Sequence, residues 1–284
     1  MKEEEILIIG SRGQLGKALS AKYSSAKKVD SDELDITNND ALLNFDWSKI
    51  SIILNAAAYT NVDGAEKETG RKMAWKINAE AVKNLAFICI KHDIKLVHIS
   101  TDYVFDGKNK IHNEDEDFSP LSVYGQSKAA GDLAVGLVPQ HYILRTSWVI
   151  GDGHNFVRTM LDLAKRNISP KVVSDQIGRI TFTSELVGAI DFLLTNHAPF
   201  GLYNVSNGGN SVSWADLARR IFEVGGFNNI NVENISTDDY FKNKDDIAPR
   251  PLQSTLSLDK IHKLGFKSRN WEEDLIEYIK KELS

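Results

Sequence analysis

Tyr124 and Lys128 form a Tyr-x-x-x-Lys pair inside a segment, residues 122–137, that we predict to be helical. Their i,i+4 spacing places both side chains on one helix face, one turn apart. A free tyrosine titrates near a pH of about 10, so it is a poor proton donor at neutrality. A lysine ammonium beside it stabilises the phenolate. The spacing therefore predicts that Lys128 lowers the pKa of Tyr124 and makes it a general acid.

Thr101 supplies a second hydroxyl that could take part in the reaction. It lies in the run Ser100-Thr101-Asp102, directly after a predicted strand over residues 95–99. Parallel α/β sheets bind ligands at the carboxyl ends of their strands. We therefore expect Thr101 to orient the substrate oxygen that Tyr124 protonates.

The Tyr-x-x-x-Lys spacing by itself has little specificity, because the chain contains it twice more. Tyr23 with Lys27, and Tyr240 with Lys244, have the same spacing without a polar strand end nearby. We expect both to be solvated surface pairs.

A glycine-rich turn lies between the first predicted strand, residues 6–9, and a helix that begins near Gln14. Gly10 permits a tight turn, Gly13 lets the backbone approach a pyrophosphate, and Gly16 lets the helix lie close to the sheet. The phosphates would then lie at the positive end of the helix. The predicted cofactor residues of this turn are Gly10, Arg12, Gly13, Gln14, Leu15 and Gly16.

Acidic residues further on could bind the adenosine end of a dinucleotide. Asp30 lies 20 residues after Gly10, where a carboxylate bonds ribose hydroxyls and disfavours a 2′-phosphate, whereas Arg12 could neutralise that phosphate. Asp35 and the adjacent Ile36 are further candidates, and both aspartates suit a loop or cap role equally well. NADPH and NADH therefore both stay open.

The elements that must position these residues alternate between strand and helix over the first half of the chain. Short apolar runs predict strands, and apolar residues at steps of three or four predict a helix over about 68–92, with Met73, Ile77 and Ala81 on its apolar face. This alternation predicts a doubly wound parallel sheet of the Rossmann type. We expect residues 1–150 to form the dinucleotide-binding domain, to which some later segments return. Residues 151–284 should form mainly a smaller, closely packed substrate-binding lobe. The further strands are predicted at 28–30, 52–54, 142–144 and 171–173, and the further helices at 155–166, 184–194, 214–224 and 271–283.

Bulk composition is that of a globular protein. The 284 residues are 42% hydrophobic and 26% charged, with a net charge of −5 and no long basic run, which argues against a nucleic-acid partner. The N-terminus is too acidic for a signal peptide, and no apolar run is long enough for a membrane span, so a cytoplasmic location without membrane contact is expected. The single cysteine, Cys89, is expected to be a buried apolar residue.

These motifs together resemble the extended short-chain dehydrogenase/reductase superfamily and, within it, the dTDP-4-dehydrorhamnose reductase family. The resemblance runs along nearly the whole chain. Its marks are the Gly10–Gly16 turn, Asn55-Ala56-Ala57-Ala58-Tyr59-Thr60 with Val62-Asp63, the run Ile99 to Gly107, the run Pro120 to Lys128, Arg145-Thr146-Ser147-Trp148, Gly153-His154-Asn155-Phe156, Asp175-Gln176-Ile177-Gly178 and Ala248-Pro249-Arg250-Pro251.

The resemblance implies reduction of the C4 keto group of dTDP-4-dehydro-L-rhamnose to give dTDP-L-rhamnose, with NADPH or NADH as reductant. It implies that Thr101, Tyr124 and Lys128 are catalytic, and that Lys128 also holds the nicotinamide ribose. The expected partners are a dTDP-sugar and, as an open question, a second copy in a homodimer. The further cofactor residues are Ala56, Ala57, Ala58 and Tyr59, and the substrate residues are Asp63, Thr101, Asp102, Tyr103, Trp148, Asn155 and Arg250.

Arg250 stands between two prolines and could bind a diphosphate bidentately, although a surface ion pair is an equal alternative. The chain departs from many relatives at Arg179-Ile180-Thr181, where they carry a proline, which leaves the sugar less defined than the reaction. Some relatives bind magnesium at a subunit interface. We find no carboxylate cluster with metal-ligand spacing here and assign no metal ligand.

Two other functions fit the same motifs. The first is another nucleotide-sugar 4-ketoreductase or an epimerase, which share the catalytic trio; an epimerase regenerates its cofactor, so net consumption would separate them. The second is a regulatory homologue without activity. The intact set of Thr101, Tyr124 and Lys128 argues against this, because a silent protein has no use for a general acid.

Overall fold

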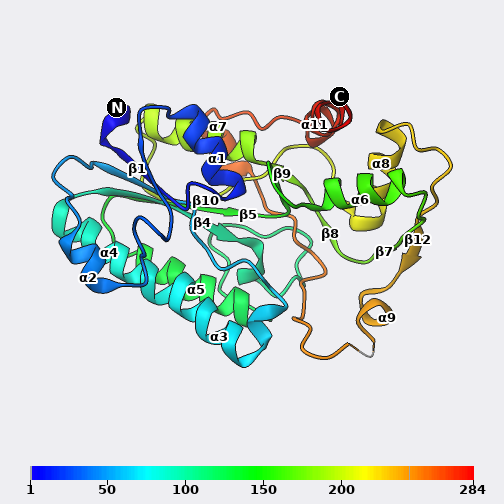
Figure 1. The fold of residues 1–284 in the computed structure, drawn as a ribbon, viewed down its shortest axis with the longest axis horizontal. Coiled ribbons are helices and arrows are strands. Elements are labelled where there is room, and N and C mark those ends of the chain that lie inside the picture. The colour runs from blue at the N-terminus through cyan, green and yellow to red at the C-terminus, as the bar shows by residue number, and fades with distance from the viewer. Residues whose placement is uncertain (1, 243) are drawn as a thin grey trace.

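A six-stranded parallel sheet forms the centre of the computed structural model, which describes residues 2–242 and 244–284 (Figure 1). The strand order is β10-β5-β4-β3-β1-β2, so β1 lies between β2 and β3 and the winding reverses there. Every neighbouring pair runs parallel, which confirms the doubly wound fold. The strands are β1 (Ile6–Ile9), β2 (Lys27–Val29), β3 (Ile52–Asn55), β4 (Lys95–Thr101), β5 (His141–Thr146) and β10 (Gly201–Asn204).

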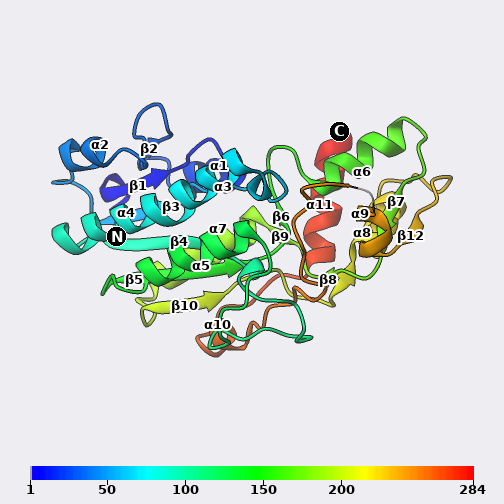
Figure 2. The ribbon, with the colours of Figure 1, turned by 90° about the horizontal axis from the view of Figure 1, so that it is seen from below.

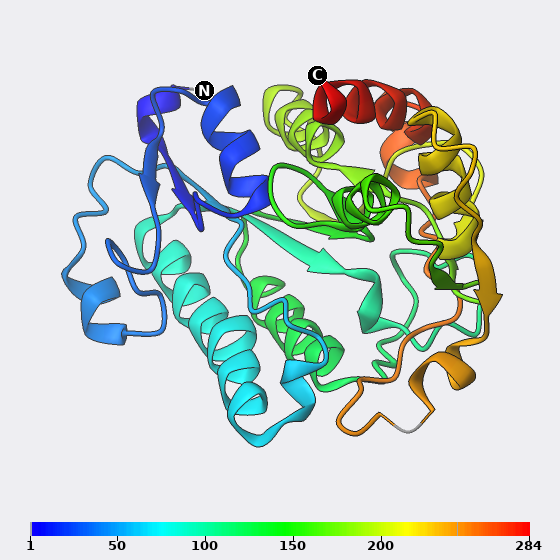
Figure 3. The same cartoon turned by 45° about the vertical axis from the view of Figure 1, so that its right-hand side comes forward.

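Helices cover both faces of this sheet (Figure 1). Side chains alternate along β1: Ile6 and Ile8 belong to one apolar core and Leu7 and Ile9 to another, so both faces are buried. The first core includes α1 (Gln14–Lys22) and α7 (Thr183–Thr195), and the second includes α2 (Asn39–Asn44), α4 (Ala81–His92) and the end of α5 (Val123–Val135). Figures 2 and 3 show α4 and α5 side by side on that second face.

The helix predicted over 68–92 is interrupted. It consists of α3 (Glu68–Trp75), a π-helical segment η3 (Lys76–Glu80) and α4. A π turn shifts the buried face by one residue. Ala74 and Asn78 are consequently buried, whereas Met73, predicted on the apolar face, is 45% exposed. The prediction was wrong for Met73 and correct for Ala81, which is fully buried.

A second, smaller core lies beyond the carboxyl edge of the sheet. It is built from α6 (Phe156–Lys165), α8 (Trp214–Val224) and α11 (Trp271–Leu283), with the parallel pair β7 (Lys171–Val173) and β12 (Glu233–Ile235). Residues after 150 are thus divided, because α7 and β10 pack with the main sheet. The remaining elements are β6 (Val149–Ile150), β8 (Ile177–Gly178), β9 (Thr181–Phe182), β11 (Val212–Ser213), α9 (Thr237–Phe241), α10 (Asp259–Lys263), η1 (Glu3–Glu5), η2 (Gly64–Glu66) and η4 (Asp102–Val104).

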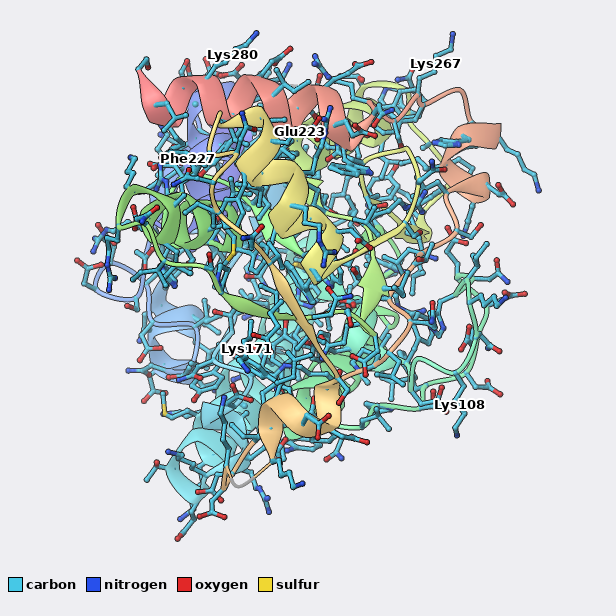
Figure 4. All side chains as sticks on the ribbon, turned by 90° about the vertical axis from the view of Figure 1, so that its right-hand side faces the viewer. Lys108, Lys171, Glu223, Phe227, Lys267 and Lys280 are labelled. Carbon is cyan, nitrogen blue, oxygen red and sulfur yellow. The ribbon has the colours of Figure 1, made fainter. Side chains whose placement is uncertain are left out.

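Several lysine side chains project from the surface, as Figure 4 shows for Lys108, Lys267 and Lys280. Across the described ranges, no helix is both long and apolar enough to cross a membrane. Cys89 is buried, as predicted.

One of the two surface Tyr–Lys pairs was predicted wrongly. Tyr23 is 1% exposed, because it continues the apolar face of α1 against α7, and its hydroxyl donates to Asp191. Tyr240 is 38% exposed, with the Lys244 Nζ atom 3.9 Å from its ring centroid.

Candidate active site

The glycine turn occupies the point where the winding of the sheet reverses. Gly10 has φ +76°, and a Cβ atom there would lie 2.7 Å from the backbone nitrogen of Ala57, so only glycine fits between the ends of β1 and β3. A Cβ atom on Gly16 would overlap the carbonyl oxygen of Gly10. Gly13 caps α1 without a side-chain bond, so the first N–H groups of the helix are left for a ligand.

A cleft of about 290 Å³ opens beside this turn. Most of the residues predicted to bind the cofactor meet there, although they come from three separate segments. The size, the small side chains and the helix terminus suit the adenosine diphosphate half of a dinucleotide. The lining residues are Ile9, Gly10, Gly13, Asp30, Ser31, Leu34, Asp35, Ile36, Thr37, Ala56, Ala57, Ala58 and Ile77.

The side chains of Arg12 and Asp30 point in different directions beside the glycine turn. Asp30 accepts the backbone N–H of Arg12 at 3.1 Å. The guanidinium of Arg12 turns outward to Asp32, at 2.6 Å, and to Glu33, at 2.7 Å. These carboxylates, Asp32 first, raise the pKa of Arg12. Neither Asp32 nor Glu33 was predicted as a partner of Arg12, although both follow Asp30 within three residues.

Asn78 connects the segment that follows β3 to helix α5. The side chain lies in the π-helical segment and is 1% exposed. Its amide bonds both backbone groups of Tyr59 and donates to Ser127 Oγ at 3.0 Å. Asn78 was not predicted, and a polar residue on a buried helix face was the signal for it. Single-turn π segments are frequent at functional sites.

Thr101 and Tyr124 lie together at the carboxyl end of β4. Thr101 is 6% exposed, and Tyr124 is half-buried on α5, whose first turn is capped by Ser122. The Tyr103 ring packs edge-on against Tyr124 at 5.7 Å between centroids. Burial raises the pKa of Tyr124, while the nearby Thr101 hydroxyl acts to lower it. The phenol therefore holds its proton at neutral pH.

Lys128 is buried behind Tyr124. Its Nζ atom donates to the carbonyl of Ile99 at 2.5 Å and lies 3.4 Å from His98 Nε2. Desolvation lowers the pKa of Lys128 to about 8, and the charge of Asp132 opposes this. The predicted lowering of the Tyr124 pKa by Lys128 is not found, because burial dominates the phenol and the ammonium is directed to the strand.

A buried polar network supports Lys128. Asp132, one helical turn further along α5, accepts from Ser100 Oγ at 2.9 Å and from Arg145 Nε at 3.3 Å. His98 is buried, which lowers its pKa and keeps it neutral. Neither His98 nor Asp132 was predicted as a site residue. A histidine in an apolar strand and an i,i+4 Lys–Asp pair were the available signals.

Trp148 stands at the border of the second core. It is half-buried with φ +49°, a strained value for a large side chain, and its ring stacks on Trp214 with centroids 3.6 Å apart. Trp214 was predicted only as the start of a helix, not as a contact of Trp148. Asn155, predicted to bind substrate, instead caps α6 and donates to two backbone carbonyls and Tyr278 Oη. Its contacts assign it a structural role.

Asp63 and Arg250, both predicted to bind substrate, bind each other. The guanidinium of Arg250 reaches the Asp63 carboxylate at 2.8 Å, and Asp63 also accepts the N–H of Ala248 at 3.1 Å. The ion-pair alternative for Arg250 is therefore realised. Among the described residues, no group of three or more acidic, cysteine or histidine side chains could hold a metal ion.

A glycine turn at a Rossmann switch point, together with a Tyr–Lys pair beside the end of β4, defines an extended short-chain dehydrogenase/reductase. The family model of the RmlD substrate binding domain matches residues 4–284, and the chain belongs to this family.

Known relatives are similar to this chain along nearly its full length. A dTDP-4-dehydrorhamnose reductase of Aggregatibacter actinomycetemcomitans is 38% identical, over 95% of this chain and 96% of that protein. A crystal structure of such a reductase from Clostridium acetobutylicum superposes with a TM-score of 0.90 at 35% identity, covering 98% of this chain and 99% of that one. The structure of the Bacillus anthracis reductase in complex with NADP gives a TM-score of 0.89 at 36% identity, covering 98% of each chain.

Proposed function

We propose that this chain is an NADPH-dependent reductase that converts the C4 keto group of dTDP-4-dehydro-L-rhamnose into the hydroxyl group of dTDP-L-rhamnose. The observation that carries the proposal is the meeting of the Thr101 and Tyr124 hydroxyls at the end of β4, on the strand edge that also forms the dinucleotide cleft. The names of the full-length relatives, and the NADP bound to one of them, support the substrate and the cofactor.

The chain's own residues would hold the cofactor in three places. The Gly10–Gly16 turn and the start of α1 would bind the pyrophosphate, Asp30 and Arg12 would bind at the adenosine ribose, and Lys128 would hold the nicotinamide ribose. When bound, the reduced nicotinamide supplies the hydride that reduces the keto carbon. NADH remains an alternative reductant, because Asp30 suits a free 2′-hydroxyl.

The protonated state of Tyr124 suits the role of general acid. Burial keeps its phenol neutral, so it carries a proton for the oxygen that becomes an alkoxide. Thr101 would bond the same oxygen and fix its position. Lys128 is mainly protonated at neutral pH, with a pKa of about 8, so its ammonium would be a donor for the nicotinamide ribose.

The second core would supply the sugar side of the site. Trp148 has a half-buried ring at the border of the second core, and the half-buried ring of Tyr103 packs against Tyr124. Arg250 can meet the substrate diphosphate only if it releases or shares Asp63. We propose residues 1–150 for the cofactor and 151–284 mainly for the substrate, and we place the reaction in the cytoplasm. A homodimer stays a prediction, and no residue is assigned to a magnesium ion.

The decisive experiment offers the purified protein dTDP-4-dehydro-L-rhamnose with NADPH or NADH and follows the absorbance of the reduced nicotinamide. Stoichiometric cofactor consumption with formation of dTDP-L-rhamnose is expected. Turnover without net consumption would point to an epimerase, and consumption only with a different keto-sugar would point to another 4-ketoreductase. No reaction with any dTDP-keto-sugar would refute the proposal.

A further inference from the structure

Asp102 bonds the hydroxyl on which the proposed reaction depends. Thr101 Oγ1 donates to Asp102 Oδ1 at 2.9 Å, and both side chains are buried, at 6% and 3% exposed. Thr101 Oγ1 also accepts the backbone N–H of Tyr103 at 3.2 Å. A hydroxyl has one proton to donate and two lone pairs. The only donor of Thr101 is therefore already committed to a carboxylate.

The hydrogen bond from Thr101 to Asp102 conflicts with the proposed role of Thr101 as a donor to the substrate oxygen. To stabilise the negative charge that develops on the substrate oxygen, Thr101 must donate its proton to that oxygen. An ionised Asp102 competes for the proton, because a carboxylate only accepts hydrogen bonds. A protonated Asp102 either donates to Thr101 or accepts from it weakly. In both cases the Thr101 proton becomes available to the substrate.

The surroundings of Asp102 make its protonation accessible near neutral pH. Burial raises the pKa of Asp102 to about 6, against the nearby Ser254 and Thr101 hydroxyls and the charge of His112. Its Oδ2 atom has no hydrogen-bond partner within the described part of the chain. The titratable groups facing it are His112, which bonds Glu116, and the neutral phenols of Tyr103 and Tyr124.

We propose that the protonation state of Asp102 sets the direction of the Thr101 hydroxyl, so that Asp102 is a positioning residue that controls whether Thr101 can donate to the keto oxygen. The proposal rests on the proposed reductase function. To that function it adds a residue that acts through Thr101. It also adds a dependence on pH that Tyr124 and Lys128 do not produce, since their pKa values lie higher.

The test is the pH profile of kcat/KM for keto-sugar reduction between pH 5 and 7, which lies below the pKa of about 8 of Lys128. The wild-type value should fall about tenfold as the pH rises through about 6, because the ionised Asp102 withdraws one of two donors to the oxygen. Asp102→Asn should abolish this limb and keep the high value at pH 7, since an amide can donate to Thr101 at every pH. Asp106→Asn is the matched control; Asp106 lies four residues on and pairs with Lys108, so its variant should keep the limb.

Thr101→Val provides a second readout if Asp102→Asn folds poorly. Activity will be low, but its profile should lack the limb, because no hydroxyl remains to be redirected. If the fall in kcat/KM above a pH of about 6 persists unchanged in either variant, the proposal for Asp102 is overturned. The reductase function itself would still stand in that case, because the wild type reduces the keto-sugar. A wild type without activity at any pH would refute the proposed function itself. Dinucleotide affinity should be unchanged in Asp102→Asn, which separates positioning from loss of structure.

Discussion

Gly13→Val should separate the ligand role of the glycine turn from its structural role. Gly13 has φ −68° and ψ 169°, which any residue adopts, and a Cβ atom there would have only the Gly10 oxygen nearby, at 3.4 Å. The folded chain therefore has room for a side chain at this position. Gly10 and Gly16 are different, because a Cβ atom on either would meet backbone.

The expected effects differ in size. The free energy of unfolding should change by no more than about 0.5 kcal/mol, which moves Tm by less than about 2 °C in a chain of this length. Pushing a pyrophosphate off the start of α1 should lose at least two charge-assisted hydrogen bonds of about 1.5 kcal/mol each. Together they amount to about 3 kcal/mol, or a rise of more than about 100-fold in the NADPH dissociation constant.

The assay is a fluorescence titration with NADPH, together with thermal unfolding of the free protein. Gly136→Val is the control, because a Cβ atom at Gly136 also has a backbone oxygen at 3.4 Å but lies at the far end of α5. The control should bind NADPH as the wild type does. If Gly13→Val binds as tightly as its parent, the turn is not the phosphate site. If it unfolds many degrees earlier, the argument from free space is wrong.

Three further outcomes are expected. Tyr124→Phe should lower turnover by at least about 100-fold with an unchanged NADPH dissociation constant, since only the proton donor is removed; undiminished turnover would end the mechanism. Neutralising the partners of Arg12 in Asp32→Asn with Glu33→Gln should improve NADPH binding severalfold relative to NADH, because the guanidinium is released for a 2′-phosphate; an unchanged ratio in paired titrations would exclude Arg12 as the phosphate ligand. Folding raises the pKa of Asp102 from its unfolded value to about 6, so its contribution to stability is complete below the unfolded pKa and is lost as the pH rises through about 6. Asp102→Asn should therefore gain up to about 3 kcal/mol over the wild type between pH 4 and pH 7 in denaturant unfolding, and a constant difference across that range would contradict the buried carboxylate.

Local patterns along the chain were sufficient to predict the fold. The spacing of apolar residues predicted the parallel sheet, because a buried strand is a short apolar run and an amphipathic helix has apolar residues at steps of three or four. The Gly10–Gly16 turn and the Tyr124–Lys128 spacing are equally local, so their geometry follows from a few consecutive residues. The π turn over Lys76–Glu80 and the exposure of Met73 have no such local sign.

Tertiary packing decided what these residues do electrostatically. Arg250 pairs with Asp63, 187 residues away, and Arg12 turns to Asp32 and Glu33; neither pairing is visible in spacing alone. The pKa of Tyr124 rises although a lysine one turn away suggested the opposite. Desolvation and charge pairing depend on which distant segments cover a group, and only the folded chain determines that.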